Sequence, residues 1–478
     1  MATAAGMALG CAAAGWLAWI AFAAQSGGTA EAARVFARFL GVGYPLWVAG
    51  WALVAWAWWN RSLRLDGPQM LLLLPAAGLL MAAVWTPPLL SDDMYRYLWE
   101  GKVLAAGWNP YVFAPNAPEL LPLARACPSL LAHVNNPELS AIYPPLPQCV
   151  FAGAAALGGE LEAIRLLLAV AAIAAIPLFH RWLERRGLPT GRTLAFAAHP
   201  LLCLEVGFGG HLDALMLLGV VVLLLGMEGA RRRGLAAAGL AAAVLTKLAP
   251  LVLLPHAARH WKSARGRWAF AASVLGICAV AYLPFAGAGP ELFSTLGTYN
   301  RNWEFNGMAH GVLVEGWYRL DPAGGRLMAP FDAAGRALGI EDAGLRLRSA
   351  KGYAPIHPAQ LLARLTSGAL FAFVWLAMLG RRWRFETQWL AVVGTGLLLS
   401  PVVHPWYLLA LLPVAFSGGA GAMGALWWTL AIPCTYAVLP RWWSEGAWEL
   451  PFWTWWVQYG GAACMMAAAC WWNRRREG

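Results

Sequence analysis

The sequence predicts an all-α protein that crosses a membrane many times. Of its 478 residues, 60% are hydrophobic and 12% are charged, and the mean hydropathy is +0.55. Soluble domains contain about 25% charged residues, so an ordinary soluble fold is excluded. The 29 Trp residues suit a chain anchored at two membrane interfaces, where Trp is enriched. In such a chain the net charge of +11 reflects basic residues that set the orientation in the membrane, so we expect no nucleic acid partner.

Apolar runs recur along the chain, most of them near the length of about 20 residues that a crossing helix needs. The first run has no basic segment before it, which favours a retained helix over a signal peptide. We expect one integral membrane domain over residues 1–478, with about 12–14 transmembrane helices and no internal repeat. The runs cover residues 8–24, 39–59, 69–90, 163–180, 193–208, 213–229, 268–286, 359–379, 387–402, 406–417, 422–440 and 452–472.

Basic residues concentrate in the short loops on one side of this predicted bundle. Short cytoplasmic loops are rich in Lys and Arg, so the loops below are expected inside and the N-terminus with them. Two long loops, residues 91–162 and 287–357, then lie on the external face. The basic loops are RSLR (61–64), RWLERRGLPTGR (181–192), RRR (231–233), RHWKSARGR (259–267), RRWR (381–384) and RRR (474–476).

Residues 234–257 do not fit as a single crossing. Basic clusters flank this apolar segment at both ends, and one crossing would place the later basic loops outside. We therefore expect two half-helices that enter and leave on the cytoplasmic side, with the turn near Thr246, Lys247 and Pro250. Broken helices at membrane depth are tolerated where they line a protein cavity.

The first external loop opens with SDDMYRYLWEGKVLAAGWNPY, residues 91–111. It predicts an amphipathic surface helix with Ser91 as N-cap and Asp92 and Asp93 in the first turn. An ionised carboxylate that points into an external cavity suits a general base. The alternative is an acidic cap with surface ion pairs. The polar candidates in this stretch are Asp92, Asp93, Arg96, Glu100, Asn109 and Tyr111, of which Asp93, Arg96 and Glu100 share one helix face.

The same loop continues with AIYPPLPQ (141–148), which contains Tyr143 and introduces a helix too short to cross. Arg165 follows near the external boundary of the next span. Two roles stay open for Arg165: an interfacial side chain that reaches toward the headgroups, or a ligand of a phosphate.

Ionisable residues also occur inside apolar sequence. GFGGHLDALM (207–216) places His211 and Asp213 at an external turn, where such groups are costly unless they are paired or wetted. Lys247 lies in the broken segment. A cation at that depth needs an anion, and a lipid phosphate is the first candidate.

Two later stretches add aromatic and amide groups at the external face. The first, TYNRNWEFNGMAHG (298–311), contains Trp303, Glu304 and Asn306, a combination that suits carbohydrate. The second, LLLSPVVHPWYLLALLP (397–413), places His404, Trp406 and Tyr407 at an external turn. A structural aromatic belt is the alternative for both stretches, and the stronger argument is that every candidate falls on one face.

The motifs SDDMYRYLWEGKVLAAGWNPY, AIYPPLPQ, GHLDAL, LTKLAPLVLLP, NWEFN and SPVVHPWYLL together resemble the polyprenol-phosphate-mannose-dependent mannosyltransferase-like branch of the GT-C superfamily of integral membrane glycosyltransferases. The resemblance spans residues 91–417 in order. It implies a transmembrane helix bundle with amphipathic helices in the first external loop, a lipid-linked sugar donor and inversion at the anomeric carbon. The absence of a P-loop or dinucleotide fingerprint agrees with a donor that is not a nucleotide.

Motif position implies that Asp93 accepts the proton of the acceptor hydroxyl, while Asp92 orients the acceptor or takes the base role itself. Arg165 and Lys247 are first candidates for the donor phosphate, with His211 and His404 second. Trp303, Glu304, Asn306 and Trp406 would shape the sugar pockets. No cofactor is required by spacing, although Asp93, Asp213 or a histidine could hold a divalent metal ion.

The resulting hypothesis is a mannosyltransferase of the bacterial inner (plasma) membrane, multi-pass, with its site on the periplasmic face and a glycan or glycolipid as acceptor. A flippase of a lipid-linked saccharide is one alternative, but it should show repeated halves and ionisable groups near the midplane. A non-catalytic scaffold is another. Within the enzyme class, the lipid could carry a different sugar.

Overall fold

The structure is a computed structural model that describes residues 1–27, 29–59, 65–229, 232–350 and 352–477. Every element in these ranges is helical, and the only β pairing among them is in isolated bridges. The loop RSLR (61–64) and Arg231 lie outside the described residues. Among the described residues, seven helices are long and apolar enough to cross a membrane, which confirms the polytopic fold class: Ala2–Ala24, Glu31–Trp58, Gly67–Val84, Leu161–Arg186, Ala264–Asn302, Pro358–Gly380 and Ala420–Glu445.

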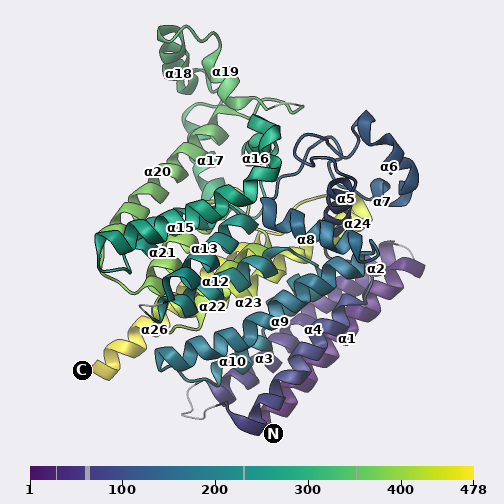
Figure 1. Ribbon diagram of the computed structural model, residues 1–478, viewed down its shortest axis with the longest axis vertical. Coiled ribbons are helices and arrows are strands. Elements are labelled where there is room, and N and C mark those ends of the chain that lie inside the picture. The colour runs from purple at the N-terminus through teal and green to yellow at the C-terminus, as the bar shows by residue number, and fades with distance from the viewer. Residues whose placement is uncertain (28, 60–64, 230–231, 351, 478) are drawn as a thin grey trace.

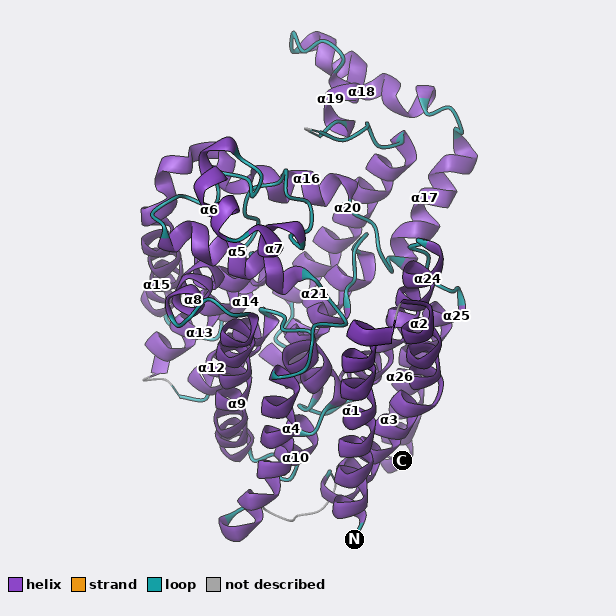
Figure 2. Ribbon diagram, turned by 90° about the vertical axis from the view of Figure 1, so that its right-hand side faces the viewer, coloured by secondary structure: helices purple, strands orange, loops and turns teal. Residues whose placement is uncertain are grey.

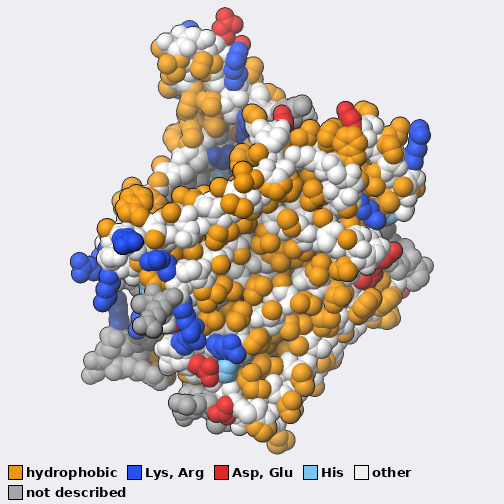
Figure 3. Space-filling model, viewed as in Figure 1, with side chains coloured by type: hydrophobic (Ala, Val, Ile, Leu, Met, Phe, Trp, Pro, Cys, Tyr) orange, Lys and Arg blue, Asp and Glu red, His pale blue; other side chains and the backbone are white. Residues whose placement is uncertain are grey.

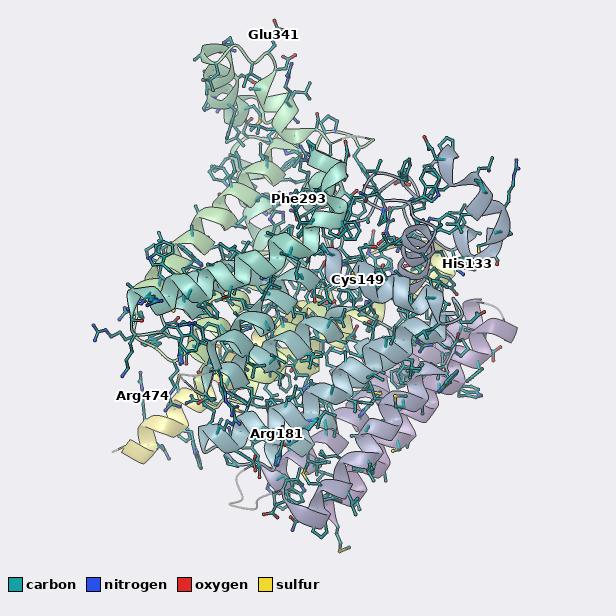
Figure 4. The ribbon with its side chains drawn as sticks, in the orientation of Figure 1. His133, Cys149, Arg181, Phe293, Glu341 and Arg474 are labelled. Carbon is teal, nitrogen blue, oxygen red and sulfur yellow. The ribbon has the colours of Figure 1, made fainter. Side chains whose placement is uncertain are left out.

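The N-terminal half of the bundle is a set of long helices that lie side by side (Figures 1 and 2). The same views place both termini at one end of the molecule, which we call the basic end because Arg181 and Arg474 lie there (Figure 4). The first and second long loops occupy the opposite end, the loop end (Figure 2). These helices are α1 (Ala2–Gly27), α2 (Thr29–Arg38), α3 (Tyr44–Trp58), α4 (Leu74–Val84) and α9 (Leu161–Arg186).

The first long loop folds into short helices at the loop end, as the sequence predicts. The surface helix α5 begins at Asp93, and Asp92 rather than Ser91 occupies its N-cap position. The Asp92 carboxylate does not cap the helix because it accepts a hydrogen bond from Asn135 instead. A Cβ on Gly101 would lie 2.2 Å from the Phe151 carbonyl oxygen, so only glycine lets α5 approach α8 this closely. The helices are α5 (Asp93–Ala105), α6 (Leu121–Ala126), α7 (Pro128–Ala132) and α8 (Pro145–Ala156).

The segment that resisted a single crossing is broken at Lys247, where the backbone leaves the helical region (φ −146°, ψ 137°). Helix α13 (Arg233–Thr246) precedes the break, and a 3-10 turn with α14 (Leu254–Ala258) follows it. Helix α13 packs along α12 (Asp213–Met227), where a Cβ on Gly239 would lie 2.3 Å from the Leu223 nitrogen.

Both ends of this broken segment lie at the basic end. Arg186, at the end of α9, pairs with Glu228, just after α12, and with Glu386 at the start of α21 (Phe385–Leu399). Residues 255–260 share a cleft with residues 381–388 of the same region. The break itself meets Asp213 at the far end of α12, so the chain enters and returns on one side, as predicted.

Two of the expected crossings are not continuous helices. Residues 193–208 form α10 (Arg192–Ala197), α11 (Pro200–Leu202) and a π-helical turn, and residues 406–417 form a 3-10 turn with α22 (Leu412–Ala415). Proline inside each run removes a helical hydrogen bond. Most of these residues are buried within the bundle, where protein can satisfy an irregular backbone.

The second long loop begins later than expected. Helix α15 (Ala264–Tyr282) continues through a 3-10 stretch into α16 (Ser294–Asn302), with a kink at Gly289 (φ 51°). Helices α18 and α19 project beyond the bundle at the top of Figure 1. The remaining helices are α17 (Met308–Leu320), α18 (Gly325–Ala337), α19 (Ala343–Arg348), α20 (Pro358–Gly380), α23 (Ala420–Ala431), α24 (Val438–Glu445), α25 (Trp453–Trp455) and α26 (Gly461–Glu477).

Candidate active site

The two acidic residues at the start of α5 have different surroundings. The Asn135 side-chain nitrogen donates to Asp92 Oδ1 and Asp93 Oδ1, at 3.0 Å each. Asp92 is exposed, whereas the Asp93 side chain is only 20% exposed and also accepts from the Tyr97 hydroxyl at 3.4 Å. Burial, followed by the negative charge of Asp92, raises the pKa of Asp93 to about 6. A carboxylate with this pKa is ionised near neutral pH and still accepts a proton readily.

Arg96 and Glu100, further along α5, hold the segment of residues 135–140 in place. Arg96 Nε donates to Glu100 Oε1 at 2.9 Å, and its remaining nitrogens donate to four backbone carbonyls of residues 135–140. Glu100 also accepts from Gln148 at 2.7 Å. Both side chains are buried, and their polar atoms hold the segment that presents Asn135 to Asp93. Their contacts favour positioning of the site over direct contact with substrate.

Lys247 and Asp213, two separate candidates in the sequence, form one pair. The Lys247 ammonium lies 2.8 Å from both Asp213 carboxylate oxygens and 4.1 Å from the centre of the Tyr407 ring. The Tyr407 hydroxyl in turn meets the Tyr299 hydroxyl at 2.7 Å. Asp213 therefore supplies the anion for which a lipid phosphate was the first candidate. The Lys247 side chain nevertheless remains 20% exposed, so the pair is not completely enclosed by protein.

The rings of His211, Trp406, His404 and Phe305 form one stack, and its His211 end lies near Asp93. His211 stacks on Trp406 with ring centres 3.7 Å apart, Trp406 on His404 at 4.3 Å, and His404 on Phe305 at 4.8 Å. The His211 Nδ1 atom lies 3.9 Å from Asp93 Oδ2, beyond hydrogen-bond distance. The stack thus connects three parts of the chain: the turn before α12, which carries His211; the turn before α22, which carries His404 and Trp406; and the second long loop, which carries Phe305.

Glu205 belongs to this region and was not among the sequence candidates. It is fully buried, its two oxygens share the single Tyr436 O–H donor at 2.9 and 3.1 Å, and one oxygen lies 3.6 Å from His211 Nε2. A carboxylate inside the apolar run of residues 193–208 was a signal that could have found it.

In the second long loop, Glu304 and Asn306 make contacts that stabilise the loop. Trp303 instead packs against Tyr299, which contacts Tyr407. Glu304 accepts from Arg364 at 2.9 Å, and Asn306, in a left-handed conformation (φ 57°), donates to Gln458 Oε1 at 2.9 Å and to a backbone carbonyl. Trp303 stacks on Tyr299 at 5.2 Å, which places it one ring away from Tyr407. Of the three candidates, Trp303 is the one whose contacts lead to Lys247.

The next three candidates contact one another and Tyr97, and none of their hydrogen bonds within the described residues reaches Asp93: Asn109, Tyr111 and Tyr143. Asn109 Oδ1 accepts from the Tyr111 backbone N–H at 3.0 Å, and the buried Tyr111 hydroxyl donates to the Tyr143 carbonyl at 2.6 Å. The Tyr143 ring packs edge-on against Tyr97, whose hydroxyl reaches Asp93. These residues fix the packing of α5 against the start of α8.

Arg165 is fully buried, and its guanidinium is engaged by backbone. It donates to the carbonyls of Thr86, Ala83 and Gly207, with the Ala83 and Gly207 contacts at 2.6 and 2.7 Å. These bonds tie α9 to the end of α4 and to the turn before His211. Between the two roles left open by the sequence, this environment favours a structural role.

Replacement of Arg165 by methionine should therefore lower stability rather than donor affinity. It removes the Arg165 donor from the Thr86 and Gly207 carbonyls, at a cost of about 1–3 kcal/mol for each group left unsatisfied. The Ala83 carbonyl still accepts from the Thr86 hydroxyl at 2.7 Å. Thermal unfolding of the purified protein in detergent should show a lower midpoint, with the KM for donor unchanged in the folded fraction. An unchanged midpoint with a raised KM would instead make Arg165 a phosphate ligand.

Within the described ranges, no group of three or more His, Cys, Asp or Glu side chains is placed to hold a metal ion. Near Asp93, the ring nitrogens of His211 lie 3.9 Å from Asp93 Oδ2 and 3.6 Å from Glu205 Oε2. No metal role is assigned to Asp93, Asp213 or the histidines.

A polytopic helix bundle whose loop end holds a partly exposed carboxylate fits the architecture that the resemblance to the GT-C integral membrane glycosyltransferases implies. The sequence model described as "Alpha-(1->6)-mannopyranosyltransferase, N-terminal domain" of the MptA/B family matches residues 1–263. The chain belongs to this family and is a mannosyltransferase. The match decides against a flippase and a scaffold. Neither the curated proteins nor the solved structures contain a match to the chain.

Proposed function

We propose that this protein transfers mannose from a polyprenyl-phosphate donor to a hydroxyl of a glycan or glycolipid, on the periplasmic face of a bacterial inner membrane. The observation that carries the proposal is Asp93, a partly exposed carboxylate with a pKa of about 6, close enough to the partly exposed Lys247 side chain for the positive charge of Lys247 to act on it. The family's α-(1->6) linkage makes a 6-hydroxyl the expected nucleophile.

In this mechanism one displacement completes the transfer. The Asp93 carboxylate accepts the proton of the acceptor hydroxyl while that oxygen forms a bond to the anomeric carbon of mannose. The bond between that carbon and the phosphate oxygen breaks, and its electron pair leaves with polyprenyl phosphate. Inversion at this carbon gives an α product only from a β-linked donor. We therefore expect β-linked mannosyl phosphate as the substrate.

The leaving group needs positive charge rather than a proton, because a phosphate departs as an anion. Lys247 is the candidate for this role. An ammonium has three N–H donors and Asp213 occupies at most two of them, so one remains for a phosphate oxygen. Asp92, exposed and held by Asn135, is suited to orient the acceptor. Trp303 and Trp406 supply aromatic faces for the sugar.

The orientation rests on the distribution of charge. Figure 3 shows a face covered mainly by hydrophobic side chains, with Lys and Arg gathered along its lower left. Arg181 and Arg474 lie on that side, away from His133 of the first long loop and from Phe293 near the far end of the α15–α16 helix (Figure 4). Cytoplasmic loops carry the excess of Lys and Arg, so the loop end is assigned to the periplasm. Because nucleotide sugars are cytoplasmic, a lipid carrier is the donor form that reaches this face.

The test is a comparison of donors in membranes that contain the wild-type protein. Radiolabelled mannose should pass from polyprenyl-phosphate mannose to a glycan or glycolipid, and not from GDP-mannose when lipid-linked donor synthesis is absent. Linkage analysis of the product should give 1,6-linked mannose. Transfer from GDP-mannose alone, or from another polyprenyl-phosphate sugar in preference to mannose, would overturn the donor assignment.

The rate of transfer is expected to rise with pH through about 6, because only the ionised form of Asp93 accepts a proton. With a pKa of about 6, kcat/KM at pH 5 should be about one tenth of its plateau. Since the charge of Asp92 raises this pKa, Asp92→Asn should move the midpoint to lower pH. The check is a profile of kcat/KM between pH 5 and 8 for both proteins. If the midpoint did not move in Asp92→Asn, the group that titrates would not be Asp93.

A further inference from the structure

A cleft at the basic end is unrelated to the reaction site. It has a volume of about 680 Å³ and lies between α14, the start of α15, the end of α20 and the start of α21. Its basic lining residues are His256, Arg259, His260, Arg267, Arg381 and Arg382, and no Asp or Glu lines it. Asp93 and Lys247 lie at the other end of the fold.

The positive charge of this cleft is not neutralised by protein. Arg267 donates to the backbone carbonyls of Trp261 and Lys262, and Arg381 lies over the Trp383 ring at 5.9 Å. None of the four arginines forms an ion pair with a carboxylate of the described ranges. The acid closest along the chain, Glu386, is already paired with Arg186 at 2.8 Å. Four guanidinium groups that face one hollow form a site for an anion, and their planar donors match phosphate oxygens.

The N-terminus of helix α21 adds to the positive potential of the cleft. It begins at Phe385, which lines the cleft, and no side chain caps its first turn. The free N–H groups of a helix N-terminus favour a negatively charged ligand. This contribution is secondary to the arginines.

The walls of the cleft indicate that the anion is attached to a lipid. Helices α15 and α20 belong to spans in which only 17% of the most apolar window is buried inside the protein, so their surfaces face the bilayer. Leu379 lines the cleft, and Leu376, one turn earlier on α20, is 60% exposed. Trp383 is 50% exposed at the rim, the position that Trp occupies at the headgroup level. A headgroup in the cleft would therefore have its acyl chains along α20.

We propose that this cleft binds the phosphate headgroup of an anionic phospholipid in the cytoplasmic leaflet, away from the donor site. The location has a structural consequence. Because α14 forms one wall, the bound lipid contacts the returning half of the broken segment whose other half ends at Thr246, beside Lys247. Lipid binding would thus hold the segment that carries the catalytic cation.

The test compares lipid binding by two variants with equal loss of charge. Arg381→Gln with Arg382→Gln removes two arginines of the cleft. The control, Arg181→Gln with Arg185→Gln, removes two exposed arginines at the end of α9 that do not line it. Each protein, purified in a neutral detergent, is titrated with phosphatidylglycerol and with phosphatidylcholine, and bound lipid is counted by native mass spectrometry.

The cleft variant should bind phosphatidylglycerol about ten-fold more weakly or worse, since each basic residue near a membrane contributes about 1 kcal/mol to such binding. The control should lose less than about two-fold in affinity. Equal losses in both variants would mean that general surface charge binds the lipid, and would overturn the proposal.

Two further measurements identify the ligand and check the fold. Inorganic phosphate at millimolar concentration should not displace phosphatidylglycerol, and displacement would make the site one for soluble phosphate instead. Equal thermal midpoints for the two variants in detergent without lipid would show that the cleft variant is folded. Transfer activity is not the readout, so failure of the donor assignment would leave this result unaffected.

Discussion

Asp93→Asn is expected to lower the turnover of mannose transfer by about 1000-fold, because a positioned general base contributes about 10²–10⁴-fold to a rate. Asparagine keeps one oxygen that can accept from Asn135, and its amide nitrogen can donate to the Tyr97 hydroxyl oxygen at the other position, so the geometry around the site should persist. Only the capacity to take a proton is lost. Initial rates with radiolabelled polyprenyl-phosphate mannose, at matched protein levels, would measure the effect.

Stability should change in the opposite direction. The folded protein holds the pKa of Asp93 at about 6, above the ordinary value of 3.8, so the fold disfavours the charged form. Between these two values the folded state binds a proton that the unfolded state releases, and stability falls as pH rises. The neutral amide introduced by Asp93→Asn removes this cost, and the variant should unfold at the same or a higher temperature than wild type near pH 7.

The matched control is Asp92→Asn, which neutralises the adjacent acid. Asp92 is exposed and is proposed only to orient the acceptor, so this variant should lose far less turnover at saturating acceptor near pH 7 than Asp93→Asn. If Asp92→Asn abolished transfer and Asp93→Asn did not, the roles of the two acids would be reversed. If both variants kept wild-type rates, neither residue would be the base.

Lys247→Met should have the second large effect, on both folding and activity. It leaves Asp213, whose side chain is 1% exposed, as a buried carboxylate without its cation. Breaking a buried ion pair costs about 3–5 kcal/mol, a large part of the stability of a folded protein. We expect a lower thermal midpoint, less protein in the membrane and no detectable transfer.

The double variant Asp213→Asn, Lys247→Met separates folding from catalysis. Removal of both charges avoids the unpaired carboxylate, so the thermal midpoint should recover most of the loss. Transfer should stay absent, because no ammonium remains to face the leaving phosphate. Recovery of both stability and transfer would show that Lys247 only neutralises Asp213, and would remove it from the mechanism.

The family match and the structure inform different parts of this site. The match covers residues 1–263, which include Asp93, His211, Asp213 and Lys247. Trp303, His404 and Trp406 lie outside it. His404 and Trp406 stack with His211, and Trp303 stacks on Tyr299, whose hydroxyl meets that of Tyr407. The assignment of the second long loop to the sugar pockets therefore rests on geometry and stays a prediction.

Several features were predictable because they depend on local sequence. The hydropathy gave the polytopic fold, and the paired basic clusters around residues 234–257 gave a broken segment with its turn at Lys247. The surface helix α5 followed from its acidic first turn and amphipathic spacing. In each case the deciding forces act within a few residues or between the chain and the bilayer, so one sequence is enough.

Other features depend on partners distant in the chain. Lys247 pairs with Asp213, Asn135 bridges Asp92 and Asp93, and Glu205 meets Tyr436 across 231 positions. The sequence by itself determined that this protein is a polytopic membrane bundle, and it predicted that the candidate residues lie on one face. Only the tertiary structure decided that Arg165 bonds backbone carbonyls while Lys247 keeps an exposed edge. The physical reason is that the free energy of a buried charge is set by the partners that packing brings to it, and that packing is not encoded in local periodicity.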